Sequence, residues 1–315
     1  MTFNAYDLSL YPGVVITILL AIIGVFGNCN IVSCRKRSLR SACNIIVACG
    51  ALSDVFHQGS HFIFAYYYVT GNAFQNLQWC YYLNILPLFN MNYGSILTLS
   101  IGVDRLFCIT APVIYARIKL NTYLLIFMIP QMIYGFVLLY ICHKSVVVHN
   151  NDSVVCMIAE MYVGKAQAYW SSAQTILYIL VIVCYIILGL VVRSKKLGKA
   201  IRRFIRSLMF IMITTVFGWF MVAFTLMFYT TTVTQPKEFD LFFIHMNVGW
   251  AANLGLASNY VIYFACSDEY RKAFYEQLKI LTFGRIKQLN HNVTKLAVTT
   301  TKRSNSSIKH YSSNF

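Results

Sequence analysis

Long apolar stretches alternate with short polar breaks along most of the chain. Residues 14–32, for example, contain no charged residue. A helix needs roughly 20 largely apolar residues to cross a bilayer, and the pattern supplies seven such segments. They lie near residues 12–34, 43–69, 80–108, 121–142, 169–192, 204–229 and 241–265. The pattern therefore predicts an all-α membrane protein, folded as a seven-transmembrane helix bundle.

The charged residues orient this arrangement. Hydrophobic residues make up 58% of the chain and charged residues 11%, a composition that excludes a water-soluble globule. Nearly all of the 26 Lys and Arg residues fall in the breaks on one side of the seven segments, and only Lys144, Lys165 and Lys237 fall on the other. Cations stay on the cytoplasmic side, so we expect a multi-pass plasma-membrane protein with an extracellular N-terminus.

The net charge of +16 is thus explained by topology and by attraction to anionic lipid of the bilayer. We expect no nucleic-acid partner, because that function needs a basic, aromatic-bearing soluble surface.

The chain divides into four predicted regions. Residues 1–11 form an extracellular N-terminus without the basic residues of a cleaved signal peptide, and 12–265 form the membrane domain. Apolar residues then recur every fourth position, which predicts a short amphipathic cytoplasmic helix on the membrane surface over 266–282. The basic, Ser/Thr-rich segment 283–315 has no acidic residue and is predicted to be disordered.

Two features of the predicted outer side can be tested directly. Asn151 begins the sequon Asn-Asp-Ser and is a glycosylation candidate. Cys80 and Cys156 both face an oxidising compartment, so a disulfide between them is expected. Cys142 lies near the same side and remains an alternative partner.

Few ionisable residues lie inside the predicted spans, and each is a candidate for function. Asp104 and Arg105 end the third span at its cytoplasmic edge, and Pro112 begins a loop shortly afterwards. The alternative interpretation is that Arg105 only anchors the helix by extending to the interface. Asp54 is the one acid well inside a span.

These residues carry a resemblance to a known superfamily. Asp104-Arg105, followed by Pro112 and Val113, resembles the signature and second inner loop of rhodopsin-like G-protein-coupled receptors. Further landmarks of that superfamily occur in order along residues 10–280, and they are Gly27-Asn28, Leu52-Ser53-Asp54, Trp219, Asn259 and Tyr263. The segments SACNIIVACGALSD, FGWF and SNYVIYFACSDEYR are most similar to nematode serpentine receptors of class SX, a chemoreceptor group.

The resemblance implies a chemosensory receptor for an extracellular small molecule that activates a heterotrimeric G protein through outward movement of helix six. A neuropeptide receptor of the same superfamily is the alternative. At rest Arg105 would pair with Asp104, and on activation it would meet Tyr185 and Tyr263. Because the inner end of helix six reads KAIRRFIR and has no acid, we expect a weak resting lock and some basal activity. Phosphorylation of the tail would recruit an arrestin-like partner.

The resemblance also constrains the ligand. Pro87 stands where amine receptors carry an aspartate, so a protonated amine lacks that counter-ion, and Asn253 replaces the lysine that binds retinal. The predicted pocket is mostly apolar with a few polar groups, as small-molecule sites are. Its candidate residues are Asn84, Pro87, Met91, Trp219, Trp250 and Asn253.

Asp54 has two interpretations under the resemblance. It would hold a sodium ion with Asn28, Asn90 and Asn259, although Gly94 replaces a serine that usually supplies a further ligand. Alternatively, water fills a hydrogen-bonded network there. No other cofactor is expected.

A rival class is an intramembrane metallohydrolase. Asp54, His57 and His61 share a helix face, and His245 could lie opposite. No other acid is available near the helices as a second ligand or general base, so we expect no enzymatic activity.

Overall fold

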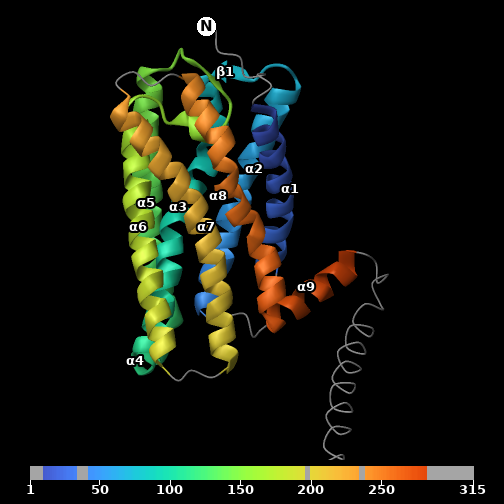
Figure 1. Ribbon diagram of the computed structural model, residues 1–315, viewed down its shortest axis with the longest axis vertical. Coiled ribbons are helices and arrows are strands. Elements are labelled where there is room, and N and C mark those ends of the chain that lie inside the picture. The colour runs from blue at the N-terminus through green and yellow to red at the C-terminus, as the bar shows by residue number, and fades with distance from the viewer. Residues whose placement is uncertain (1–9, 34–41, 196–198, 234–237, 282–315) are drawn as a thin grey trace, which may run out of the picture. The chain divides into compact units, whose positions relative to one another are not determined.

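The computed structural model describes residues 10–33, 42–195, 199–233 and 238–281. Residues up to Arg271 form one compact unit, and a second unit begins at Lys272. In the described part, the first unit contains seven long helices that run side by side (Figure 1). They are α1 (Tyr11–Val32), α2 (Ala42–Val69), α3 (Leu77–Thr110), α5 (Leu120–Val148), α6 (Lys165–Ser194), α7 (Lys199–Thr232) and α8 (Glu238–Cys266).

Polar side chains lie among the apolar ones inside the bundle, and its outer surface is rich in apolar side chains. Asn28, Gln58 and Asn92 are buried between the helices, whereas Leu125 and Ile133 of α5 point outward and are more than half exposed. Soluble monomers rarely expose a continuous apolar surface of this kind. By length and composition, four helices of the described part can cross a membrane, and they are Tyr11–Val32, Leu120–Val148, Lys165–Ser194 and Ile213–Thr232.

One end of the bundle, here called the sheet end, carries a feature that the sequence analysis did not predict. Strand β1 (Phe74–Asn76) pairs antiparallel with β2 (Ser153–Val155). A disulfide joins Cys80 to Cys156 beside this sheet, with 5.5 Å between their Cα atoms. This is the pairing favoured from the sequence, and Cys142 is a free, buried thiol. The sheet and disulfide together fix the α5–α6 connection over the top of α3.

The opposite end of the bundle, here called the α4 end, differs from the sequence prediction. Pro112 does not begin a loop but takes the first position of a short helix, α4 (Pro112–Arg117). Proline is favoured there because its fixed φ suits a helix and its missing N–H would have no partner within the helix. Figure 1 shows α4 and β1 near opposite ends of the bundle.

Two short elements complete the described chain. The 3₁₀ helix η3 (Ile158–Met161) follows β2, and α9 (Asp268–Leu281) follows α8. Helix α9 falls within the range 266–282, and the amphipathic, cytoplasmic membrane-surface helix expected there remains a prediction. Most of the N-terminal region 1–11 and all of the tail 283–315 lie outside the described residues.

Helices α1 and α8 approach closely because glycine removes a side chain at their contact. A Cβ at Gly27 would lie 2.6 Å from the Tyr260 Cβ, which is closer than two such atoms can stand. Small residues commonly permit this approach between helices in a membrane, where packing rather than water exclusion drives association. The approach brings Asn28 against α8, where its amide donates to the Leu256 carbonyl at 3.2 Å.

Candidate functional site

A buried ion pair lies near the α4 end of α3. The Arg105 Nε is 3.2 Å from the Asp104 Oδ2. Two phenols also donate to this carboxylate, Tyr123 of α5 at 2.8 Å and Tyr115 of α4 at 3.2 Å. Asp104 is fully buried, and these partners together replace the water that a carboxylate loses near hydrocarbon. The predicted Asp104–Arg105 pairing is therefore present, with two further partners.

The two tyrosines were missed in the sequence analysis. Tyr115 lies on the short helix α4, which was expected to be loop, and Tyr123 lies 19 residues after Asp104. Burial and the neighbouring Asp104 carboxylate raise the pKa of Tyr115 to about 12, so its hydroxyl stays protonated at neutral pH and can donate.

Tyr185 of α6 and Tyr263 of α8 are buried and close enough to Arg105 to interact with it electrostatically. Tyr185 can reach this position because α3 has Gly102 opposite, where a Cβ would stand 2.8 Å from the Tyr185 Cε2. The structure therefore brings both predicted switch tyrosines to the arginine. Pro112 and Val113 open α4 nearby, and Val113 is 63% exposed.

Lys195 adds a link between α6 and α3 that was not foreseen. Its Nζ donates to the Ile109 carbonyl at 2.7 Å. That carbonyl belongs to the last turn of α3, where backbone oxygens have no partner within the helix and a cation is favoured. The side chains of the segment KAIRRFIR, where no acid was found in the sequence, lie outside the described residues.

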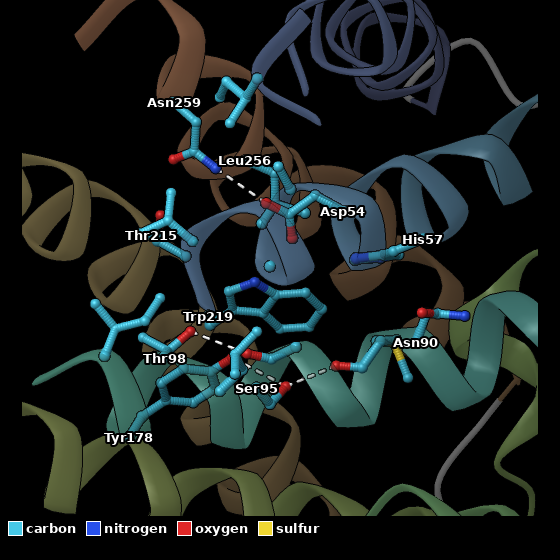
Figure 2. A pocket seen from close by; sticks show the side chains of 18 of the residues that line it. Asp54, His57, Asn90, Ser95, Thr98, Tyr178, Thr215, Trp219, Leu256 and Asn259 are labelled. Atoms are coloured by element: carbon cyan, nitrogen blue, oxygen red, sulfur yellow. Dashed lines mark hydrogen bonds between the residues drawn. The ribbon is translucent and has the colours of Figure 1, made fainter. Parts of the chain in front are cut away.

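A second polar cluster surrounds Asp54 in the middle of the bundle (Figure 2). The Asn259 amide of α8 donates to the Asp54 Oδ2 at 2.9 Å. The amide of Asn90 points away from Asp54 in Figure 2 and donates to the Leu86 carbonyl of its own helix at 2.8 Å. Asn28 donates to α8 instead. Of the four residues proposed to surround an ion, the structure joins only Asp54 and Asn259 directly by a hydrogen bond.

A cavity of about 60 Å³ lies beside Asp54. The Asn259 Oδ1 and Thr215 Oγ1 are buried there with no protein partner. Ser53 Oγ fills the place where a side chain at Gly94 would begin, and it donates to the Asn90 carbonyl at 2.6 Å. About 15 Å³ suffices for one water molecule, so the cavity has room for a few. A cation there would take most of its ligands from water.

A smaller cavity of about 40 Å³, here called the deep cavity, lies between the Asp54 cluster and the sheet end. His61 is hydrogen-bonded to the Asn253 Oδ1 at 3.0 Å, and the His57 ring packs 5.3 Å from that of Trp219. Met91, Trp219 and Asn253, three of the predicted pocket residues, line this cavity. The other three do not, since Asn84 and Pro87 are buried elsewhere on α3 and Trp250 is partly exposed.

One acid contradicts the sequence analysis, which found no further acid near the helices that could act as a second metal ligand or a general base. Glu160 of η3 reaches down from the α5–α6 connection, and its Oε1 lies 2.5 Å from the Nδ1 of His245 on α8. The error arose because Glu160 belongs to a loop in the sequence, and only the disulfide and the sheet fold that loop over the bundle. The expected disulfide at Cys156, four residues earlier, was the sequence feature that could have placed Glu160 near the helices.

Glu160 also faces a much larger cavity of about 530 Å³ at the sheet end, here called the sheet-end cavity. The α5–α6 connection, the first turn of α6, Thr230 of α7 and the beginning of α8 surround it. This volume falls in the range of small-molecule sites. None of the six predicted ligand residues lines the sheet-end cavity. The sequence therefore located only the deep cavity, through Met91, Trp219 and Asn253.

The comparison with known families settles the class. The family model described as "Serpentine type 7TM GPCR chemoreceptor Srsx" matches residues 21–278, which is most of the chain. The chain belongs to this Srsx family. The resemblance seen in the sequence motifs is thereby confirmed. No curated protein matches the chain.

Membership in the serpentine chemoreceptors bears on the rival class, because the family is one of receptors and not of enzymes. Within the described part of the Srsx chain, no group of three or more His, Cys, Asp and Glu side chains is arranged to hold a metal ion. Asp54 is engaged by Asn259 and His61 by Asn253, so the proposed metal ligands have different partners.

Proposed function

We propose that this Srsx receptor crosses the plasma membrane seven times with its N-terminus outside, and that it passes the binding of an extracellular small molecule to a heterotrimeric G protein. Four sufficiently apolar helices, the apolar outer surface and the one-sided Lys/Arg distribution support the membrane placement. With this orientation the sheet end faces outward and the α4 end faces the cytoplasm.

The Asp104–Arg105 cluster is the observation that carries the proposal. Asp104 holds Arg105 at rest, while Tyr115 and Tyr123 hold Asp104. Outward movement of α7, the sixth long helix, would release Arg105 toward Tyr185 and open the cytoplasmic face to a Gα subunit. A ligand drives such a two-state change only by binding one state more tightly.

A small molecule fits the cavities better than a peptide does. The deep cavity has a volume of only about 40 Å³, and residues of β1, β2 and η3 help to line the sheet-end cavity. The neuropeptide alternative requires instead that peptides, and no small molecule, raise nucleotide exchange by the receptor. Recruitment of an arrestin-like protein depends on the tail 283–315, outside the described residues, and remains a prediction.

Ligand-independent nucleotide exchange tests the coupling. Membranes with wild type and with Arg105→Ala, at matched surface expression, are compared for GTP-analogue binding by a panel of Gα subunits. We expect basal exchange in the wild type that the variant loses, because Arg105 is the group released on activation. Arg117→Ala on α4 is the matched control and should retain most of the signal. Absence of exchange on every Gα with either protein would contradict the proposal of a weakly locked resting state.

A further inference from the structure

The Glu160–His245 contact lies between two cavities. Glu160 lines the sheet-end cavity, and His245 lines the deep cavity on the other side. Resting on the receptor function proposed above, we infer that the sheet-end cavity binds a small cationic ligand whose protonated nitrogen pairs with Glu160 in place of His245. The ligand class is an organic ammonium compound with an apolar body.

The charges of the sheet-end cavity favour a cation. Glu160 and Asp152 are its acids, and Lys165 is its one fixed cation among the lining residues. Asp152 and Lys165 are exposed to water, whereas the Glu160 side chain is only 13% exposed. His149 is engaged with its own helix through the Ser145 carbonyl at 2.9 Å. A largely desolvated carboxylate attracts a cation more strongly than an exposed one does.

His245 is a partner that a ligand can displace. Its Nδ1 meets Glu160, but its Nε2 is buried and has no protein partner. A primary ammonium brings three donors and a full charge to the same carboxylate. Displacement would leave the His245 ring free to turn within the deep cavity, where His61 and Trp219 also lie.

This assignment revises the argument from Pro87. The absence of an aspartate on α3 removes one counter-ion for an amine, but η3 supplies another carboxylate from above. Apolar lining from Val155, Leu241 and Phe242 would take the body of the ligand. The cavity thus offers a largely buried carboxylate beside apolar side chains.

Binding to purified full-length receptor in lipid nanodiscs tests the inference without any G protein. The probes are phenylethylamine and phenylbutylamine, each paired with the alcohol and the carboxylate of the same carbon skeleton, and Kd is measured by isothermal titration calorimetry. We expect at least one amine to bind more tightly than its alcohol. Glu160→Gln should raise the Kd of that amine by about tenfold or more, as expected for the loss of a hydrogen bond between charged groups. The Kd of each alcohol should stay unchanged.

Two variants separate this role from a structural one. Asp152→Asn removes the exposed acid of the same cavity and should change the amine Kd by less than about twofold. His245→Leu removes the competitor for Glu160 and should tighten amine binding, whereas a merely structural contact would weaken it. The inference is overturned if no amine binds better than its alcohol, if a carboxylate binds best, or if Glu160→Gln binds amines as the wild type does. The basal-exchange comparison with Arg105→Ala tests the proposed receptor function independently, because it uses no ligand.

Discussion

Tyr123 donates its hydroxyl hydrogen to the Asp104 carboxylate across the α3–α5 contact, at 2.8 Å. The charged pair of the receptor signature is therefore part of a larger cluster, in which Asp104 is shared between Arg105 and two phenols. In the proposed switch, Asp104 stays fixed to α5 and α4 while Arg105 is released. This gives the carboxylate a stable position in both states.

Removal of the Tyr123 hydroxyl should loosen this cluster. We predict that Tyr123→Phe lowers stability by about 1.5–3 kcal/mol, the usual value of a hydrogen bond to a charged group, seen as a fall of several degrees in the thermal unfolding temperature in detergent. Tyr140→Phe is the matched control, because Tyr140 lies on the same helix and is 60% exposed. Equal effects of the two changes would remove any special role for the Tyr123–Asp104 bond.

The close contact between α1 and α8 predicts an asymmetry between two glycines. Gly27→Ala places a Cβ against Tyr260, and relief of that overlap should cost about 1–3 kcal/mol. Gly59→Ala on α2 meets nothing within 4 Å and should be neutral or stabilising, since alanine is the better helix former. Thermal unfolding of both variants is the measurement. A Gly27→Ala receptor as stable as the wild type would show that the helices separate easily.

Loss of the Cys80–Cys156 disulfide should reduce the amount of folded receptor more than loss of the free thiol of Cys142 does. Cys156→Ser opens the link to Cys80, which lies 76 residues earlier in the chain, and the chain-entropy estimate for a loop of that size is about 4.5 kcal/mol. We predict a strong loss of cell-surface receptor by antibody labelling of intact cells. Cys142→Ser, which removes a buried free thiol, should retain most of it. The reverse ranking would indicate that Cys142 forms the functional bridge.

The sequence predicted the long helices well because apolar runs and helices coincide inside a membrane-like bundle. Their ends were less predictable. The expected span 121–142 belongs to α5, which continues to Val148. The end of an apolar run need not be the end of the helix, because backbone hydrogen bonds continue through polar residues such as Lys144.

The sequence identified candidate site residues only where they lie inside a predicted helix and differ from their apolar neighbours. Asp104, Arg105 and Asp54 were found from their charge alone, because charge inside an apolar run is rare. Glu160 and Tyr115 were missed, since each lies in a connection whose path depends on the fold. Asn90 was placed correctly on α3, but its rotamer directs the amide away from Asp54, and no sequence pattern fixes a rotamer.

Glycosylation tests the orientation on which the proposed function depends. Asn151 is exposed beside β2, and we predict that receptor made in animal cells carries a glycan there. Asn151→Gln should then abolish the mobility shift that a glycosidase produces. Asn292→Gln in the predicted cytoplasmic tail is the control and should leave the shift intact. A shift that depends on Asn292 would place the C-terminus outside and overturn the orientation.

The Asp54 cavity yields a prediction about ions. Among the described residues, only Asp54, Asn259 and Thr215 bring a carboxylate, an amide oxygen or an unpaired hydroxyl to this cavity. The Asn90 amide points away, and Ser53 donates to a backbone carbonyl. Hard cations such as Ca²⁺ take six to eight oxygen ligands, so this site suits water better than a tightly held ion. We predict that sodium chloride and potassium chloride at equal ionic strength give the same unfolding temperature for the purified receptor. Asp54→Asn should lower stability equally in both salts, because it alters the carboxyl group that accepts the hydrogen bond from the Asn259 amide. A stabilisation specific to sodium that disappears in Asp54→Asn would show instead that the cavity binds the ion, with water completing its coordination.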